Sequence, residues 1–334
     1  PPLVSVTHLE TITSPLPLEE VHDARGEENE PESTDVHGIA VESAQGERLS
    51  VGDVAVKPDG ETLQKVLARM GLGSRRKLEE SIQAGEITVN GKTAKLGDRV
   101  VAGDKIKFKG RPVANDQVLD NRILLYHKPV GEVCSRKDPE GRPTVFEGLP
   151  RLKSGRWVSV GRLDYNTSGL LLMTTDGELA NALMHPSTRV EREYLVRVMG
   201  RVDDAMLGRL KAGVELDDGP ARFTDIQEGG SDSEGINRFF YVVLAEGRNR
   251  EVRRLWESQG TTVSRLKRVR YGDVFIPSKL KKGQWMELKQ RDVDVVYTMA
   301  QMEPKPVYQP SKKLADKRER QSKKSGKHIA KRDK

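Results

Sequence analysis

A run of residues near the middle of the chain combines turn-forming polar side chains with a single carboxylate. It reads Gly-Arg-Leu-Asp-Tyr-Asn-Thr-Ser-Gly-Leu-Leu-Leu from Gly161 to Leu172, and its one acid is Asp164. Apolar residues lie on both sides of the polar part, which predicts a loop held between two buried strands. A carboxylate on such a loop could act as a base or a nucleophile on a molecule that docks over it. The alternative is that Asp164 only caps backbone N–H groups of its own turn, as most loop aspartates do.

A second group of candidate residues follows the continuous apolar run from Phe239 to Leu244, which predicts a central strand covered on both sides. After a glycine turn the spacing predicts a helix on which Arg250 and Arg254, four residues apart, share a face. Arg253 lies at the boundary between that face and the apolar one. A turn at the end of a buried strand is a frequent place for a binding site. The alternative is a basic helix face that is merely solvated.

Two short helices and a small sheet are predicted before these motifs. Thr62 can cap a helix with apolar residues at helical spacing, and Ser74 can cap a second one. An Asn-Gly pair at Asn90 predicts a tight hairpin. The first turn of the second helix holds Arg75, Arg76 and Lys77, although the helix dipole disfavours positive charge there. A phosphate backbone is the natural reason for three bases at this position.

The distribution of charge points to the same class of partner. The chain has 334 residues, of which 35% are apolar, enough for about two ordinary domains. Residues 1–60 hold thirteen acidic and three basic residues, whereas residues 303–334 hold twelve basic and four acidic ones. The formal net charge is +7, so the part between these segments is basic. A basic body indicates a polyanionic partner, most simply a nucleic acid, and the alternative is a surface that only provides solubility.

Other features of the composition exclude several classes of protein. No apolar run approaches the roughly 20 residues of a membrane-spanning helix, and the first residues do not resemble a secretory signal, so we expect a soluble protein. Cys134 is the single cysteine, which rules out an internal disulfide and a cysteine-based metal cluster. The six histidines show no metal-ligand spacing. We therefore expect no bound metal and a cytoplasmic location.

The predicted helices and hairpin resemble an S4 RNA-binding domain. The resemblance rests on Leu-Gln-Lys-Val-Leu-Ala-Arg from Leu63, on Gly-Ser-Arg-Arg from Gly73 and on the stretch from Gly85 to Lys92. In that family two helices and a small sheet present basic residues to structured RNA. Such a module occurs in enzymes and in pure binding proteins, so it indicates a ligand and not a reaction. The resemblance implies RNA contacts from Lys65, Arg69, Arg75, Arg76 and Lys77.

The remaining motifs, taken in order, resemble a pseudouridine synthase of the branch that carries an S4 domain and acts on ribosomal RNA. They are Gly-Arg-Leu-Asp from Gly161, Ser-Gly-Leu-Leu-Leu from Ser168, Asp176-Gly177, Glu193-Tyr194, and the arginine-rich run from Gly247 to Arg254. The Asp-Pro-Glu-Gly-Arg-Pro stretch from Asp138 is most similar to the type that acts on the bacterial large subunit. The resemblance implies a target in 23S rRNA, uridine 2605 in the bacterial reference numbering.

The resemblance also implies roles for individual residues. Asp164 matches the catalytic aspartate, Tyr194 the aromatic residue that stacks on the uracil, and Arg253 the cation that pairs with the acid. The isomerisation gains and loses no atom, so we expect no cofactor. Further RNA contacts are implied for Arg162, which would occupy space vacated by the target base, and for Arg248, Arg250 and Arg254. One departure from the family pattern is Arg192, where the family usually has lysine.

The expected fold is α+β. We expect a disordered acidic segment over residues 1–60, an S4 domain over 61–110 and a linker. A pseudouridine synthase domain would follow over 121–300, with a central, mostly antiparallel mixed sheet flanked by helices, and then a disordered basic tail over 303–334. The expected partner is 23S rRNA or a pre-ribosomal particle, bound by a monomer. Two alternatives remain: a sister synthase for another uridine of 16S or 23S rRNA, and a non-catalytic S4 protein of ribosome assembly.

Overall fold

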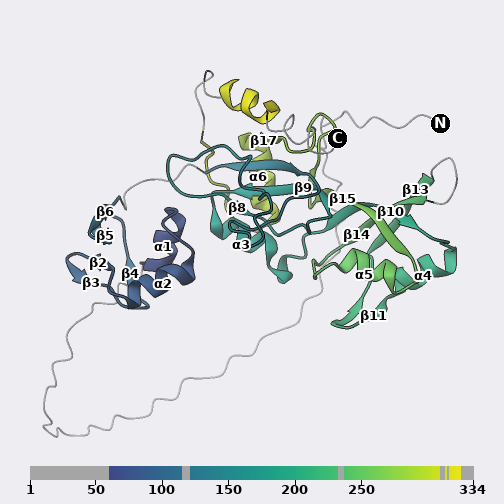
Figure 1. The fold of residues 1–334 in the computed structure, drawn as a ribbon, viewed down its shortest axis with the longest axis horizontal. Helices are drawn as coiled ribbons and strands as arrows, with labels where there is room; N and C mark the ends of the chain where they lie inside the picture. Colours follow the sequence, from purple (N-terminus) through teal and green to yellow (C-terminus); the bar gives the residue numbers. More distant parts are fainter. Residues whose placement is uncertain (1–59, 115–120, 232–236, 309–312, 314–315, 325–334) are drawn as a thin grey trace, which may run out of the picture. The chain divides into compact units, whose positions relative to one another are not determined.

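The computed structural model describes residues 60–114, 121–231, 237–308, 313 and 316–324. The acidic segment that was expected to be disordered lies outside these residues, apart from Gly60, and so do residues 325–334 of the basic tail. Most of the described chain forms two bodies, which correspond to the expected S4 domain and the expected catalytic domain (Figure 1).

The first body is built from two helices and short strands, as the sequence predicts. Helix α1 is capped at Thr62 without a side-chain hydrogen bond, whereas Ser74 caps α2 by accepting from the backbone N–H of Lys77 at 3.2 Å. The Asn90-Gly91 turn has φ values of 51° and 83°, which suit a type I′ hairpin. A four-stranded sheet has the order β3-β2-β5-β6, and β1 pairs with β4. The elements are β1 Glu61–Thr62, α1 Leu63–Arg69, α2 Arg75–Gln83, β2 Ile87–Val89, β3 Lys92–Thr93, β4 Arg99–Val100, β5 Ile106–Phe108 and β6 Arg111–Val113.

Strand β6 differs from the sequence analysis, which placed these residues in a linker. Lys109 and Gly110 both adopt left-handed backbone conformations, with φ of 50° and 76°. This geometry turns the chain back on itself, so Arg111 pairs with Phe108 and Val113 with Ile106. Part of the expected linker therefore belongs to the first body.

The second body contains a nine-stranded sheet with the order β13-β14-β10-β15-β9-β7-β17, to which β8 and β16 add at β9 and β15. All the pairs are antiparallel except β9 with β15, which confirms the expected mostly antiparallel mixed sheet. The strands are β7 Ile123–Lys128, β8 Val158–Ser159, β9 Ser168–Thr174, β10 Arg192–Met199, β13 Asp225–Ser231, β14 Asn237–Leu244, β15 Thr262–Tyr271, β16 Val274–Phe275 and β17 Trp285–Glu287. A separate hairpin pairs β11 Val214–Leu216 with β12 Gly219–Ala221.

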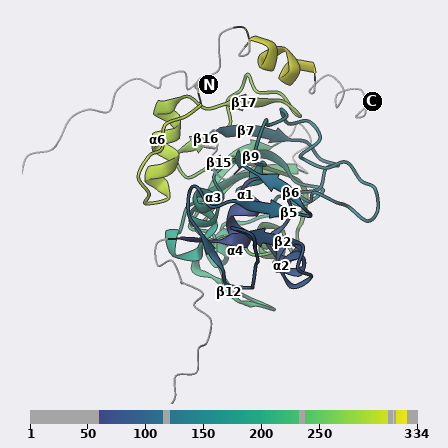
Figure 2. The same ribbon diagram turned by 90° about the vertical axis from the view of Figure 1, so that its left-hand side faces the viewer.

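Three clusters of buried residues form the core around the sheet, and helices contribute to two of them. On β9, Leu170 and Leu172 pack with α3 and α6, and Leu171 and Met173 pack on the opposite face with Trp157 and Trp285, as the two-residue period of a strand requires. In the other half of the sheet, α4 and α5 pack on β10 and β14. Figure 2 shows α6 at the side of the sheet near β16. The helices are α3 Gly177–Met184, α4 Asp204–Ala212, α5 Glu251–Glu257 and α6 Gln290–Met299, with a 3-10 turn at Pro186–Thr188.

The two halves of the sheet are joined at one glycine. In the parallel pair of β9 with β15, Gly169 lies opposite Arg268. Its φ is +112°, and a Cβ at this position would lie 2.2 Å from the backbone oxygen of Arg268. Only glycine can adopt this backbone conformation and allow the strands to approach so closely. Gly169 therefore holds the loop of Asp164 against the second half of the sheet.

Residues 316–324 of the basic tail are helical, whereas the sequence analysis expected disorder. Within this segment, Ser322 is only 5% exposed. The Ser322 hydroxyl accepts from the backbone N–H of Trp285 at 2.9 Å and donates to its carbonyl at 2.5 Å. Arg318 also pairs with Glu287 at 3.2 Å. Strand β17 is at the end of the sheet order, and its outer backbone groups need partners that the tail supplies.

Two truncations should separate the structural and the electrostatic roles of this tail. Ending the chain at residue 302 removes Lys305, Arg318 and Ser322, so we expect the melting temperature to fall by several degrees, since a loss of about 1 kcal/mol moves it by 2–4 °C at this size. Ending it at residue 324 should leave the melting temperature unchanged and lower the salt dependence of RNA binding, because four basic residues are lost. Calorimetry and a salt titration of the RNA affinity provide the two readouts. Equal melting temperatures for both truncations would contradict the anchoring of the tail on β17.

Candidate active site

The loop that carries Asp164 connects β8 to β9, so the predicted arrangement of strand, loop and strand is present. Strand β8 pairs with the end of β9, which closes the loop at its base. Within the loop the N–H of Thr167 donates to the carbonyl of Asp164 at 3.0 Å, and the N–H of Gly131 donates to the carbonyl of Tyr165 at 2.9 Å. The backbone on both sides of the acid is therefore fixed by the fold.

Lys128, which the sequence analysis did not select, organises this loop from beneath. It ends β7, its side chain is fully buried, and its Nζ donates to the carbonyls of Pro129, Asp164 and Thr167 at 2.9, 3.0 and 2.9 Å. Burial lowers the pKa of this amine, and the three carbonyls satisfy its three donors. Lys128 thus holds the backbone of the acid in place without using the carboxylate. Its only sequence signal was a lysine before a proline at the end of a predicted strand.

Replacing Lys128 by methionine should uncouple the loop from the strand. Methionine fills a similar volume but leaves three buried carbonyls without their donor, so we expect a loss of at least about 2 kcal/mol in the free energy of unfolding. The turnover rate should fall more than the RNA affinity, because the position of Asp164 is affected and the RNA-binding surface is not. Denaturant unfolding and single-turnover kinetics provide the readouts. The matched control is Lys279→Met at an exposed position, and equal effects of the two substitutions would refute the role of Lys128.

A cavity of about 720 Å³ opens over the loop, which is a volume typical of ligand sites. Asp164 lies in its wall, and so does Tyr194 from β10. The register between β10 and β15 shifts between Glu193 and Tyr194, and such irregularities commonly redirect a side chain beside an active site. Tyr194 packs against the core clusters of both halves of the sheet. The structure therefore brings the acid and the aromatic residue into one hollow.

Arg253 lies beneath the same loop, although it does not form the expected ion pair with Asp164. It is 8% exposed, and its two terminal nitrogens donate to the carbonyls of Val263 at 2.8 Å and Asn166 at 3.0 Å. Burial lowers the pKa of Arg253, and the negative charge of Asp164 partly offsets this effect. Among the described residues, its Nε has no hydrogen-bond partner. The guanidinium thus supports the loop through Asn166 and attracts Asp164 through space.

Two of the three arginines that were expected to contact RNA through α5 are used within the protein. Arg254 forms a two-point ion pair with Asp218, at 2.7 and 2.8 Å. Arg248 contacts Asp218 at 3.2 Å and donates to the backbone carbonyls of Gly219 and Pro220. Both side chains therefore fasten the β11–β12 hairpin to the start of α5. The sequence analysis missed this because Asp218 lies thirty or more residues earlier in the chain.

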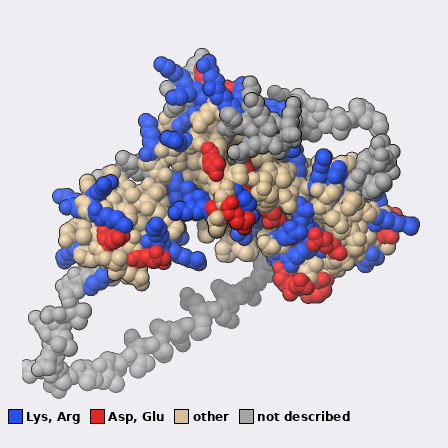
Figure 3. Space-filling view, viewed as in Figure 1, with Lys and Arg blue, Asp and Glu red and all other residues tan. Residues whose placement is uncertain are grey.

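The other residues expected to bind RNA lie at the surface, and some of them form ion pairs with acidic residues of the protein. Arg250 is exposed, lines the cavity and pairs with Glu257 at 3.5 Å, and its backbone is left-handed with φ of 48°. Arg162 is also exposed and lines the cavity. In the first body, Lys65 and Arg69 pair with Glu61. Figure 3 shows Lys and Arg spread widely over the face that it draws. Arg75, Arg76 and Lys77 are exposed at the start of α2, as an RNA contact requires.

Two further arginines of the cavity wall, Arg268 and Arg192, were not selected as site residues from the sequence. Arg268 on β15 is 3% exposed and donates from Nε to the carbonyl of Leu170 at 2.7 Å. Within the described part of the chain, its Nη2 has no hydrogen-bond partner. Arg192, which departs from the family pattern, donates to the carbonyls of Val190 and Ala245 at 2.6 and 3.1 Å. Both bonds come from the same nitrogen, Nη1, so the side chain links the ends of two segments of the chain.

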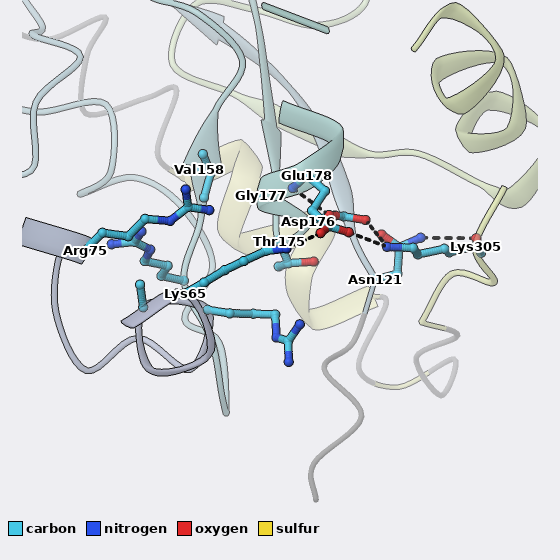
Figure 4. Close-up of a pocket in the computed structure, with 12 residues that line it drawn as sticks. Lys65, Arg75, Asn121, Val158, Thr175, Asp176, Gly177, Glu178 and Lys305 are labelled. Atoms are coloured by element: carbon cyan, nitrogen blue, oxygen red, sulfur yellow. Dashed lines mark hydrogen bonds and ion pairs between the residues drawn. The ribbon is translucent and has the colours of Figure 1, made fainter. Parts of the chain in front are cut away.

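The Asp176-Gly177 motif has a structural task. Asp176 caps α3, and its other oxygen accepts from Lys305 at 2.7 Å (Figure 4). The same oxygen accepts from Tyr297 at 2.9 Å. Burial opposes its ionisation, but Lys305 and Tyr297 outweigh this effect and hold its pKa below the usual range.

Among the described residues, no group of three His, Cys, Asp or Glu could hold a metal ion. No helix in the same ranges is long and apolar enough to cross a membrane.

Comparisons with known proteins match the two bodies. The sequence model of the family described as RNA pseudouridylate synthase matches residues 122–258, and that of the S4 domain matches residues 61–106. Three curated relatives are named ribosomal large subunit pseudouridine synthase B. The one from Pseudomonas aeruginosa is 53% identical over 82% of this chain and 71% of its own length. Those from Vibrio cholerae and Escherichia coli are 58% and 56% identical over 73% of this chain, and over 76% and 84% of their own lengths.

Proposed function

The chain belongs to the RNA pseudouridine synthases, in the family of ribosomal large subunit pseudouridine synthase B, and we propose that it isomerises one uridine of 23S rRNA. It is therefore an enzyme that acts on RNA. Uridine 2605 in the bacterial reference numbering is the proposed target. The observation that carries this proposal is the shared cavity, in which Asp164 and Tyr194 face one space of about 720 Å³.

The reaction follows from what these side chains can do. The bond from uracil N1 to ribose C1′ breaks, the uracil turns over, and a bond from C5 to C1′ forms. The proton on C5 is lost and one is gained on N1, so the product has the same atoms as the substrate. Asp164 acts at the sugar, either by attacking C1′ or by removing the proton of C2′. Arg253 supplies positive charge beneath the loop that carries the acid.

Tyr194 would hold the uracil while it is detached. A flat ring with two torsions can stack on a base at little entropic cost, and Tyr194 is kept in place by packing on both sides. The target base must first leave the RNA stack, which costs a few kcal/mol. We propose that Arg162, which is exposed two residues before Asp164, fills the space that the base leaves.

Binding of the RNA would be shared between the two bodies. The exposed bases at the start of α2 suit the phosphates of a folded RNA, which fixes the position of the substrate without reading its sequence. We propose Arg250 as the contact from α5, because it is exposed in the cavity wall and held only by one long contact with Glu257 at 3.5 Å, whereas Arg248 and Arg254 are bound to Asp218. Because these surface residues would bind the RNA, the residues of the cavity wall would remain available for the reaction.

A map of pseudouridine in the rRNA of a strain lacking this gene tests the proposal. One pseudouridine should disappear from the 23S rRNA, and it should return with the wild-type gene but not with the Asp164→Asn variant. Loss at another uridine, or in 16S rRNA, would favour a sister synthase. An unchanged map, together with no tritium release from C5-labelled rRNA by the purified protein, would favour the non-catalytic binding protein.

A further inference from the structure

A large aromatic side chain next to the catalytic loop has no role in the reaction described above. Tyr165 directly follows Asp164, is 42% exposed and lines the mouth of the cavity. Its backbone is fixed, because its carbonyl accepts from Gly131 and the neighbouring Asp164 carbonyl is held by Lys128. Exposed tyrosines are common, but this one stands on a rigid support at the entrance through which the RNA must pass.

Arg142 lies beside this ring and is fixed as firmly. Its guanidinium carbon is 5.7 Å from the centroid of the Tyr165 ring. Asp138 holds it by a two-point pair, from Nε at 3.0 Å and Nη2 at 2.8 Å, and also accepts from the Arg142 backbone N–H at 2.8 Å. Glu140 pairs with the third nitrogen at 3.1 Å. Asp138 and Glu140 thus fully compensate the charge of the guanidinium, whose flat group is held over the ring.

The turn that carries Arg142 is itself anchored in the body. Val133 and Thr144 form a parallel bridge, and Val133 exchanges hydrogen bonds with Pro143 and Val145 at 2.9 and 3.0 Å. Val145 is fully buried in the cluster that also contains Trp157 and Leu163. The Tyr165 ring and the Arg142 guanidinium are therefore held together before any ligand binds, although they are more than twenty residues apart in the sequence.

We propose that Tyr165 and Arg142 form a stacking platform for a nucleobase next to the target uridine. The proposal rests on the RNA modification described above. An aromatic ring with a guanidinium at its side is a general surface for an unstacked base, since every base has a π face. Tyr194 lies between the two cores and Tyr165 at the mouth, so the uracil meets the first ring and its neighbour meets the second. The flipping of the target leaves such a neighbour without its stacking partner.

Base-deleted RNA separates this role from other contributions to binding. The probes are synthetic fragments of 23S rRNA that contain the target uridine, either intact or with an abasic residue on its 5′ or 3′ side. Tyr165→Ala should weaken binding of the intact fragment roughly 5- to 100-fold, the range expected for one stacked base. On one of the two abasic fragments the wild type and the variant should bind equally. Tyr165→Phe should bind all fragments like the wild type.

The control is Tyr241→Ala, since this tyrosine is 38% exposed on β14 and does not line the cavity. It should leave every affinity unchanged. Arg142→Ala, which does not alter the catalytic loop, should reproduce the pattern of Tyr165→Ala with a smaller loss. The salt slope of binding should stay constant, because the guanidinium is already neutralised and contacts no phosphate. A lower slope, an equal loss on all fragments, or no loss at all would overturn the proposal.

Kinetics distinguish the platform from the chemistry. At saturating RNA the rate of tritium release by Tyr165→Ala should stay within a few-fold of the wild type, because the ring does not touch the reacting uracil. A large fall at saturation with unchanged affinity would place Tyr165 in the chemistry and refute the platform. If the wild type released no tritium from the intact fragment, the proposed target would be wrong, whereas the affinities would still test the stacking.

Discussion

Asp164→Asn is expected to reduce the rate of pseudouridine formation by about 10³-fold or more, while the RNA affinity changes by no more than a few-fold. The amide has the same shape as the carboxylate, but it can neither attack the sugar nor take a proton from it. In the described residues the Asp164 carboxylate accepts no hydrogen bond, and only its backbone carbonyl is used by Lys128 and Thr167. The substitution should therefore leave the fold intact.

Single-turnover tritium release and a binding titration on the same RNA measure the two quantities. Asp273→Asn is a suitable control, because Asp273 is exposed on the turn between β15 and β16, away from the cavity wall. Its rate and affinity should match those of the wild type. Appreciable turnover by Asp164→Asn would mean that another group performs the chemistry at the sugar.

Gly169→Ala is expected to have the largest effect on folding, a loss of about 4 kcal/mol or more in the free energy of unfolding. Two penalties combine at this residue. Its φ of +112° is rarely adopted by other residues, and the added Cβ would lie 2.2 Å from the carbonyl oxygen of Arg268. The strands must separate to relieve that contact, so the only parallel pair of the large sheet would be disturbed. Activity should be lost together with stability, because the loop just before β9 carries Asp164.

Gly208→Ala is the matched control. Gly208 lies within α4, and a Cβ added there meets no atom within 4 Å. We expect this variant to be about 0.5–1 kcal/mol more stable than the wild type, since alanine favours a helix over glycine. Chemical denaturation of both variants tests the prediction. A Gly169→Ala protein as stable as the wild type would show that β9 and β15 can pair without a close approach at this residue.

Much of the fold could be predicted because it depends on local patterns. The apolar run at Leu170–Met173 predicted β9, and the run at Phe239–Leu244 predicted the end of β14. Ser74 and the Asn90-Gly91 turn were recognised from chemistry that acts within a few residues. The long strand β15 was largely missed, because its lysines and arginines interrupt the apolar pattern and its buried residues Val263, Leu266 and Tyr271 do not follow a two-residue period.

The candidate site also has a part that the sequence predicted and a part that it did not. Its motifs and their order assigned the chain to an enzyme family and selected Asp164 and Tyr194, which lie in one cavity. The destinations of the basic side chains could not be predicted. Arg248 and Arg254 had the same sequence appearance as Arg250, yet they bind Asp218 on a distant hairpin. Lys128, with no notable pattern, proved to support the loop that carries Asp164.

The sequence by itself thus determined which residue types are available for the reaction and which local elements carry them, because helix caps, turns and apolar periods act over short distances. The tertiary structure alone decided which polar groups are consumed inside the protein and which remain free. That choice depends on partners far apart in the chain, such as Asn166 for Arg253 and Asp218 for Arg254. A long charged side chain can reach several acceptors, and only the packed backbone fixes which one it meets.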